Sequence, residues 1–427
     1  MNTKCSPITT IPTEPGPVAF ERPLGGLEHF FWPIDQHRPV HFAMAAQVEG
    51  RTTISGWSAA LNAVQERHPL LSVAIQTVAD RRPSFRTGAD AAIPLRITKA
   101  PLSSWQTEVA RELATPFNPE QAPLVRAALL HGLRESVLIV SAHHSIADGL
   151  SLAYIVRDIL HALAGEALEP LAPMPAEEPL VYMSQQPRED TGNIEQQEPS
   201  SEGRPVTFRA LRHSLPGIDA LCLSPELTGK LIERARRERT TVHGALCSAL
   251  VLAGRESFDE WIRTPVRILS PFNLRKQIGV GEDCGVFVWG AAVAMPPGVP
   301  ADFWEMARFA KSSLAARQSM ERVAIEMQGV EKAMGSGIDV PGAAQILAQG
   351  FPCELLLTNL GNLPLQFDCG DLKLKALWGP SVLMGFEGEQ TVGVTTVNGS
   401  LCLLHTSFAP LPLLLQRAER ILRFACE

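Results

Sequence analysis

The segment Val137–Gly149, with the sequence VLIVSAHHSIADG, decides the fold class of this 427-residue chain. It begins with four bulky aliphatic residues, a pattern typical of a buried strand. The strand pattern stops at His143 and His144, and Asp148 and Gly149 close the loop. The apolar residues after the loop fall on one helical face: Leu152, Ile155, Val156, Ile159, Leu160 and Leu163. The loop is therefore expected to be held between a buried strand and a packed helix.

The two histidines are expected to differ in their surroundings. Successive strand side chains point to opposite faces, so one imidazole should face a cavity and the other packed protein. An imidazole titrates close to neutral pH and can serve as a general base. Asp148 can cap the following helix or bind a distant cation. Gly149 permits backbone conformations that a residue with a Cβ resists.

Other roles for this loop compete with that of a general base. An isolated pair of histidines is most often structural. A metal site needs convergent ligands at a recognisable spacing, and these two side chains diverge, so no metal is predicted. A Ser-His-Asp hydrolase would carry the pattern G-x-S-x-G, which the chain lacks. The histidine would therefore have to act without a protein nucleophile.

Composition indicates a globular protein. Hydrophobic residues make up 45% of the chain and charged residues 19%, and the length suggests two domains. The net charge of -7 argues against a nucleic-acid partner. No apolar run approaches the roughly 20 residues of a membrane helix. The cysteines lack a C-x-x-C pair and are expected to be reduced thiols in a cytoplasmic protein: Cys5, Cys222, Cys247, Cys284, Cys353, Cys369, Cys402 and Cys426.

Residues 173–205 divide the chain. They are rich in proline and acidic residues and lose apolar periodicity, which predicts an extended connector. Residues 1–17 lack the apolar region of a signal peptide and are expected to form a loose tail. The two remaining parts, 18–172 and 206–427, both interleave strand and helix patterns. This predicts an α/β or α+β architecture.

Several further elements are predicted from periodicity and capping residues. Strands are expected at 42–48, 71–75, 137–140, 266–269, 286–289, 355–358 and 401–405. Helices are expected around 57–64, 152–163, 225–231, 242–250, 303–310 and 413–424. Ser224 and Asp302 are placed to cap two of these helices.

The loop and several other segments resemble one known family. His143–Gly149 is similar to the HHxxxDG motif of the condensation-domain superfamily. That superfamily includes peptide-synthetase condensation domains, polyketide-associated acyltransferases and, more distantly, chloramphenicol acetyltransferase. Further similar segments follow the family's order over nearly the whole chain: Glu66–Leu71, Pro116–Asn118, Ala122–Ala127, Asn273–Arg275, Cys284–Trp289 and Thr358–Gly361.

The resemblance implies two chloramphenicol-acetyltransferase-like domains in a V, with a tunnel between them. It implies that His144 is the general base, supported by His143 and Gly149. Asp148 would be structural and would pair with Arg275. The resemblance also implies an acyl-CoA or acyl-phosphopantetheine thioester as donor substrate, an alcohol or amine as acceptor, and no permanently bound cofactor.

Other positions are weaker candidates. Phe287 and Trp289 are candidates to line the substrate tunnel, although core packing explains them equally well. Thr358 and Asn359 are candidates to hydrogen-bond a substrate in the tunnel. A run of arginines could bind a CoA phosphate or a carrier protein, or could simply be a solvated face: Arg234, Arg236, Arg237 and Arg239.

The plant-type DFGWG box is absent, and no flanking adenylation or carrier domain is expected. A stand-alone acyltransferase is therefore the leading hypothesis, and a monomer is compatible with it. One alternative is a non-catalytic protein that binds a carrier protein. Another is a stand-alone condensation enzyme that forms an amide.

Overall fold

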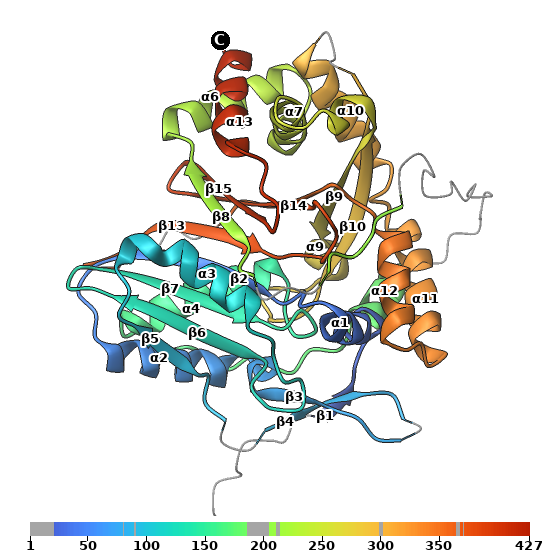
Figure 1. Cartoon of the computed structure of the whole chain (residues 1–427). Helices are drawn as coiled ribbons and strands as arrows, with labels where there is room; N and C mark the ends of the chain where they lie inside the picture. Colours follow the sequence, from blue (N-terminus) through green and yellow to red (C-terminus); the bar gives the residue numbers. More distant parts are fainter. Residues whose placement is uncertain are drawn as a thin grey trace, which may run out of the picture.

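The computed structural model describes residues 21–79, 81–88, 91–185, 205–210, 214–298, 302–363, 368–369 and 371–427. The expected tail 1–17 and much of the expected connector 173–205 lie outside these ranges. Within them, the chain forms two lobes, each built on a six-stranded sheet (Figure 1). A small three-stranded sheet extends the lower lobe: β1 (Glu21–Pro23), β4 (Ser84–Thr87) and β3 (Val73–Gln76).

The lower sheet is built around β7, the strand predicted before the histidine loop. Its strand order is β12 (Asp368–Cys369), β13 (Leu372–Ser381), β2 (Phe42–Glu49), β7 (Glu135–Ala142), β6 (Val125–His131) and β5 (Leu95–Thr98). Helices α2 (Ile54–Arg67) and α4 (Gly149–Leu163) cover one face. Helix α3 (Trp105–Ala114) covers the other. Because both faces of β7 are buried, its centre, Val137–Val140, is a continuous apolar run rather than an alternating one.

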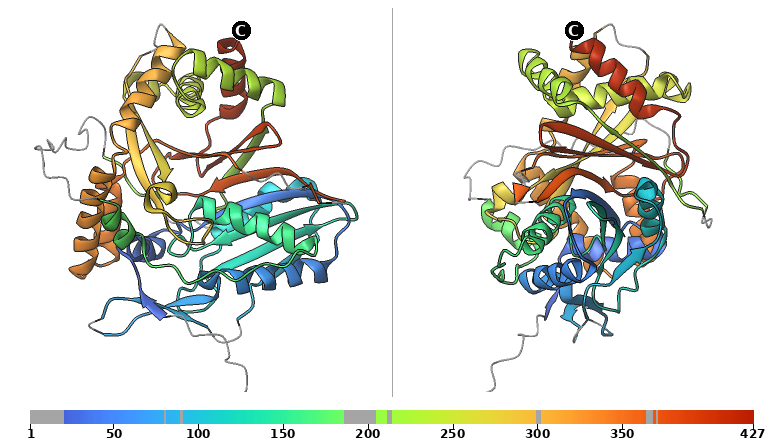
Figure 2. Two further views of the ribbon diagram at one scale, coloured as in Figure 1. Left: turned by 180° about the vertical axis from the view of Figure 1, so that it is seen from behind. Right: turned by 90° about the vertical axis from the view of Figure 1, so that its left-hand side faces the viewer.

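The upper sheet carries its helices on its outer face (Figure 1 and Figure 2). Its order is β10 (Val288–Met295), β9 (Val266–Asn273), β11 (Leu355–Asn362), β14 (Gln390–Val397), β15 (Ser400–Ser407) and β8 (Gly217–Cys222). The covering helices are α6 (Pro225–Arg237), α7 (Val242–Arg255), α10 (Phe303–Ala315) and α13 (Leu414–Ala425). Two short helices, α8 (Glu260–Arg263) and α9 (Arg275–Ile278), flank β9.

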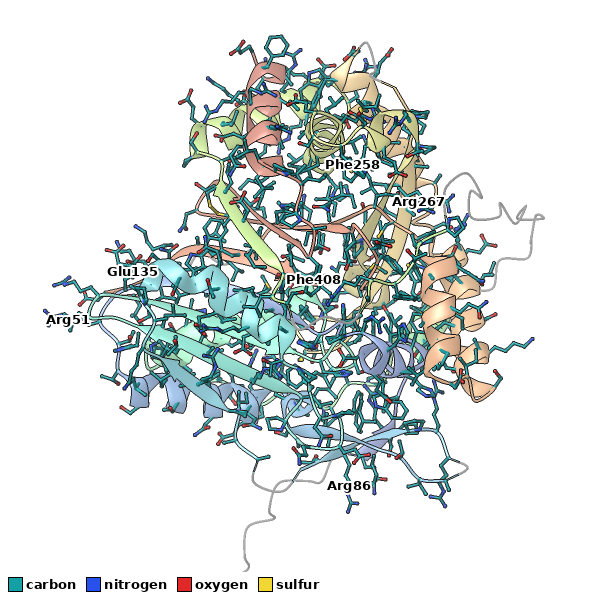
Figure 3. All side chains as sticks on the ribbon, viewed as in Figure 1. Arg51, Arg86, Glu135, Phe258, Arg267 and Phe408 are labelled. Atoms are coloured by element: carbon teal, nitrogen blue, oxygen red, sulfur yellow. A yellow bond between two sulfur atoms is a disulfide. The ribbon has the colours of Figure 1, made fainter. Side chains whose placement is uncertain are left out.

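The predicted helix caps are present. The Ser224 hydroxyl accepts a hydrogen bond from the Leu227 N–H at 3.2 Å, and Asp302 Oδ1 accepts one from the Trp304 N–H at 2.7 Å. Side chains fill the space between the layers, whereas charged residues such as Arg51 and Arg86 point outward (Figure 3). No helix among the described residues is long and apolar enough to cross a membrane.

The two lobes exchange elements. β13 follows the upper-lobe strand β11 in sequence, yet it pairs antiparallel with β2 of the lower sheet, with Trp378 opposite Ala45. Helices α11 (Met320–Gly335) and α12 (Val340–Gly350) pack against α1 (Gly26–His37) in the lower lobe. One continuous core therefore contains residues from both halves of the sequence.

Three expectations need correction. Residues within the expected extended connector form a helix, α5 (Glu177–Ser184), whose first turn is buried against α1. Cys222 and Cys402 form a disulfide rather than two free thiols. Their pairing follows from strand register, because β8 and β15 place them directly opposite each other, with Cα atoms 4.1 Å apart. Spacing along the chain cannot reveal a pair separated by 180 residues. The third correction concerns where strands start: the strands expected at 71–75 and 286–289 each begin two residues later, as β3 and β10.

Candidate active site

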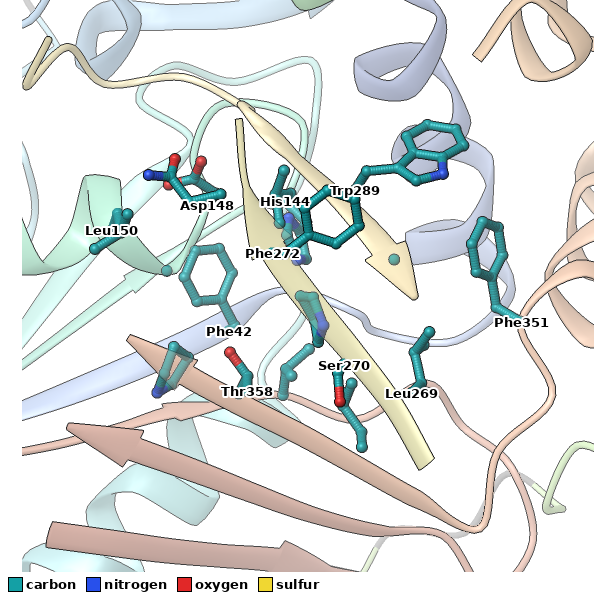
Figure 4. Close-up of a pocket in the computed structure, with 18 of the residues that line it drawn as sticks. Phe42, His144, Asp148, Leu150, Leu269, Ser270, Phe272, Trp289, Phe351 and Thr358 are labelled. Atoms are coloured by element: carbon teal, nitrogen blue, oxygen red, sulfur yellow. The ribbon is translucent and has the colours of Figure 1, made fainter. Parts of the chain in front are cut away.

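The histidine loop opens onto a cavity where the two lobes meet. The cavity has a volume of about 450 Å³ and is lined mainly by apolar side chains. Its walls come from α1, the start of β2, the loop after β7, the strands β9, β10 and β11, and the end of β13 (Figure 4). An apolar cavity with a few polar groups, at the junction of two lobes, is a typical small-molecule site.

His144 lies in the wall of this cavity between two aromatic rings. Its imidazole stacks on Phe31, with ring centres 4.0 Å apart and planes at 6°, and contacts Phe42 at 4.7 Å. Its Nδ1 is buried and makes no hydrogen bond of standard geometry to any residue that the structure describes. This arrangement leaves Nε2 as the nitrogen that can serve a substrate.

Burial lowers the pKa of His144 below its usual value of 6.5. The nearby backbone of His144 and Ala147 and the charge of Asp148 oppose this shift without cancelling it. The imidazole is therefore neutral at neutral pH, which is the form that can accept a proton.

His143 faces packed protein instead. Its Nδ1 accepts a hydrogen bond from the Ser145 N–H at 3.1 Å, and its Nε2 lies 3.6 Å from Asp35 Oδ2 at the end of α1. Desolvation lowers the pKa of His143 to about 4. Asp35 also accepts hydrogen bonds from the Val40 and His41 backbone N–H groups. His143 therefore anchors the loop against α1 rather than meeting substrate.

Asp148 and Arg275 form a buried ion pair between the two halves of the chain. Arg275 Nη1 donates to Asp148 Oδ2 at 2.6 Å, and Nη2 donates to Oδ1 at 3.1 Å. Asp148 Oδ1 also caps α4 by accepting from the Ser151 N–H at 2.8 Å, and Oδ2 accepts from the Phe287 N–H at 3.0 Å. Although burial opposes it, the charge of Arg275 and these hydrogen bonds hold the pKa of Asp148 below its usual value. Both carboxylate oxygens are thus committed to holding the loop.

Gly149 is required by space rather than by backbone conformation, which corrects the expectation from sequence. A Cβ at this position would lie 2.7 Å from Cγ of Pro380 and 3.0 Å from Cδ2 of Leu360. Its φ is not positive. The residue lets the start of α4 approach β11 and β13 closely, at the wall of the cavity.

The four suggested tunnel residues do not all reach the cavity. Trp289, Thr358 and Asn359 line it, and the Trp289 indole N–H donates to Glu326 Oε2 at 2.7 Å. Phe287 does not line it. Its buried ring packs over the Arg275 guanidinium at 4.9 Å, and the residue lies just before β10 begins at Val288.

The arginine run lies on the outer surface, at the end of α6 (Figure 1). Arg234 pairs with Glu238 at 3.0 Å, and Arg237 lies 3.7 Å from Glu233. None of the four arginines lines the cavity between the lobes.

Sequence reasoning missed several residues of the site. Phe31 and Phe42 hold His144, and His243 and Ser270 add polar groups to the cavity wall. A second cavity of about 430 Å³ shares Leu383 with the first. Two arginines that were not predicted line this second cavity, Arg38 and Arg209. Only tertiary contacts reveal these groups, since no local pattern marks them.

Comparison with known families agrees with this geometry. Residues 35–184 match the condensation domain, and residues 213–368 match the C-terminus of phthiocerol/phthiodiolone dimycocerosyl transferase. The chain belongs to the superfamily of condensation domains and polyketide-associated acyltransferases. The two matches follow each other along the chain, as the predicted resemblance requires.

Similar curated proteins are large synthetases. Tyrocidine synthase 3 of Brevibacillus parabrevis is 32% identical over 125 residues, which is 29% of this chain and 2% of that protein. Bacitracin synthase 2 of Bacillus licheniformis is 27% identical over 139 residues, which is 32% of this chain and 5% of that protein. The matches thus span only a few percent of these relatives.

Similar solved structures confirm the two-lobed fold. Polyketide synthase associated protein 5 from Mycobacterium tuberculosis superposes with a TM-score of 0.65 at 17% identity, covering 95% of this chain and 98% of that one. The first condensation domain of the CDA synthetase gives a TM-score of 0.65 at 16% identity, covering 95% and 96%.

Proposed function

We propose that this protein is an acyltransferase that moves an acyl group from a thioester to a hydroxyl or amine acceptor, with His144 as general base. The observation that carries the proposal is the neutral imidazole of His144, fixed between Phe31 and Phe42 in an apolar cavity between the lobes. Family membership supports acyl transfer or condensation as the reaction class.

The reaction needs one base and no protein nucleophile. Nε2 of His144 accepts the acceptor's proton while the acceptor oxygen or nitrogen bonds to the thioester carbonyl carbon. The carbon–sulfur bond then breaks, and the leaving thiolate takes the proton from the imidazolium. The products are an ester or amide and a free thiol, so protons and charge balance.

The start of α4 can stabilise the oxyanion that forms during attack. Gly149 and Leu150 line the cavity and are the first residues of this helix. Their N–H groups are among those that a helix leaves without intrahelical partners, and they carry the positive end of the helix dipole. Backbone donors placed beside developing negative charge lower the barrier to acyl transfer.

The second cavity suits the phosphate-bearing part of a donor. Arg38 and Arg209 line it, and Leu383 separates it from the catalytic cavity. Guanidinium groups bind phosphate well. A CoA or carrier-bound phosphopantetheine donor is therefore proposed to approach from this side.

An amide-forming condensation is the second candidate. It is favoured by the match of residues 35–184 to the condensation domain, shared with peptide synthetases such as tyrocidine synthase 3. The chemistry at His144 is the same, and only the acceptor differs.

Thiol release tests the proposal. The purified protein is incubated with a panel of acyl-CoA and acyl-carrier donors, with and without alcohol or amine acceptors. Released thiol is measured, and the products are identified by mass spectrometry. We expect acceptor-dependent thiol release with an ester or amide of matching mass. A folded protein that binds a carrier but releases no thiol with any donor would contradict the proposal and favour a non-catalytic role.

A further inference from the structure

A second imidazole lies in the wall of the catalytic cavity and takes no part in the mechanism above. His243, in the first turn of α7, has Nε2 2.8 Å from the hydroxyl oxygen of Ser270 on β9. Both residues line the cavity. Figure 4 labels Ser270 and His144 at separate places on the cavity wall, and the apolar ring of Phe272 belongs to the same wall.

The pair has hydrogen-bonding capacity left over. Neutral histidine and serine together carry two polar hydrogens, one N–H and one O–H, and their mutual bond uses one of them. No further hydrogen bond joins either side chain to a residue that the structure describes. Whichever tautomer His243 adopts, one donor remains, and the serine oxygen retains a lone pair. The pair can therefore both donate to and accept from a ligand.

The surroundings select an uncharged ligand group. Burial lowers the pKa of His243 to about 4, so the imidazole is neutral at neutral pH. The neighbours of Ser270 on β9 are Leu269, Pro271 and Phe272, which also line the cavity and offer no charge. Placing an ionised group against such a wall would cost much free energy, whereas a hydroxyl or carbonyl would satisfy the pair.

We propose that His243 and Ser270 form a second recognition point that binds a hydroxyl or carbonyl oxygen of the substrate, away from the reacting thioester. The inference rests on the proposed function and narrows its substrate class. The preferred substrate would carry an uncharged oxygen along its acyl chain or its acceptor, rather than being a plain hydrocarbon. Sites built around a hydrogen bond discriminate strongly against analogues that lack the bonding group.

Calorimetric binding in a His144→Ala background tests this without turnover. The probes are hexanoyl-CoA against its 4-, 5- and 6-hydroxy and keto derivatives, and hexan-1-ol against the hexanediols and hydroxyhexanones. We expect at least one oxygenated probe to bind about tenfold more tightly than its hydrocarbon counterpart. Adding Ser270→Ala or His243→Leu should reduce the ratio of the two affinities, oxygenated probe over hydrocarbon counterpart, to near one. His243→Gln retains an amide that can bond to Ser270, and it should keep part of the preference.

Ser141→Ala is the matched control. Ser141 is a fully buried strand serine that does not line the cavity, and its hydroxyl makes no hydrogen bond among the described residues. This control should leave the preference unchanged. The proposal is overturned if no oxygenated probe binds more tightly, or if the preference survives both Ser270→Ala and His243→Leu. Absence of thiol release by the wild type would instead contradict the proposed function, because the binding preference is measured independently.

Discussion

At the scale of single residues, burial decides which groups are charged. His144 and His143 are adjacent, yet one stacks between Phe31 and Phe42 in the cavity and the other lies beside Asp35. Burial lowers the pKa of both imidazoles. The sequence motif identifies His144 as the candidate base, but its aromatic partners come from α1 and β2 and could not be predicted from local patterns.

The pH dependence of the reaction follows from the lowered pKa of His144. In the proposed mechanism the neutral imidazole is the active base, so kcat/KM is lost as pH falls through this pKa. Since the pKa lies below 6.5, we expect kcat/KM with an alcohol acceptor to be constant through neutral pH and to fall only in more acidic buffer. A rate profile between pH 5 and 9 measures this. Half-maximal activity at or above pH 7 would contradict the assigned environment.

Because of Glu177, the free energy of unfolding should fall as pH rises. Both of its carboxyl oxygens are buried without a hydrogen-bond partner among the described residues. Burial and the charge of Glu178 raise its pKa well above 4.5. Between the unfolded and folded pKa values the folded state holds more protons, so the free energy of unfolding falls by up to about 1.4 kcal/mol per pH unit.

We expect Glu177→Gln to flatten this slope and to stabilise the protein at pH 8. Urea unfolding of both proteins at pH 5, 6.5 and 8 measures it. An unchanged slope would show that Glu177 is ionised in the folded protein.

At the scale of elements, the start of α4 is where sequence and structure agree most closely. The periodic apolar face predicted this helix, and the predicted pair of Asp148 with Arg275 is present at 2.6 Å. Elsewhere, contacts between segments far apart in the sequence determine which helices and strands form. Helix α5 forms in the expected connector because α1 covers its first turn, and β13 was missed because its partner β2 lies in the other half of the sequence. Alternation likewise could not separate Phe287 from Trp289, because residues two apart share a face; in the structure β10 begins only at Val288, so Phe287 lies outside the strand.

Removing one partner of the Asp148–Arg275 pair should lower the stability of the folded protein. Removing one partner leaves a buried charge, so Arg275→Met is expected to lower the free energy of unfolding by about 3–5 kcal/mol. In the double variant Asp148→Asn with Arg275→Met neither charge remains, so much of the loss should be recovered. Urea unfolding of the single and double variants gives the coupling energy. Additive losses would show that the two side chains do not interact.

Gly149→Ala should destabilise through crowding. The new Cβ would meet Pro380 at 2.7 Å and Leu360 at 3.0 Å, and overpacking of this kind costs about 1–3 kcal/mol. Gly229→Ala is the control, because this glycine of α6 has no atom within 4 Å of the added Cβ. It should be neutral or stabilising. Equal effects of the two substitutions on the melting temperature would refute the role of close packing at Gly149.

At the scale of the whole molecule, exchanged elements bind the two lobes into one unit. β13 belongs to the lower sheet, and its Trp378 stacks on Trp105 of α3, with ring centres 5.3 Å apart. The two lobes were expected from the family resemblance, whereas the pairing of β13 with β2 of the lower sheet was not. Because the cavity that contains His144 lies between the lobes, this connection also fixes the position of its two walls relative to each other.

We therefore expect the two lobes to unfold together. Urea transitions followed by tryptophan fluorescence and by far-ultraviolet circular dichroism should coincide, since one core contains residues of both halves. Two separated transitions would show that the lobes are independent despite the exchange.

The central claim is that His144 is the base of an acyl transfer, and the most direct measurement is thiol release by His144→Ala. The variant should fold, because the imidazole makes no hydrogen bond of standard geometry among the described residues. We expect its acceptor-dependent rate to fall by about 10²–10⁴-fold, with an unchanged circular dichroism spectrum. Full activity in the folded variant would contradict the claim.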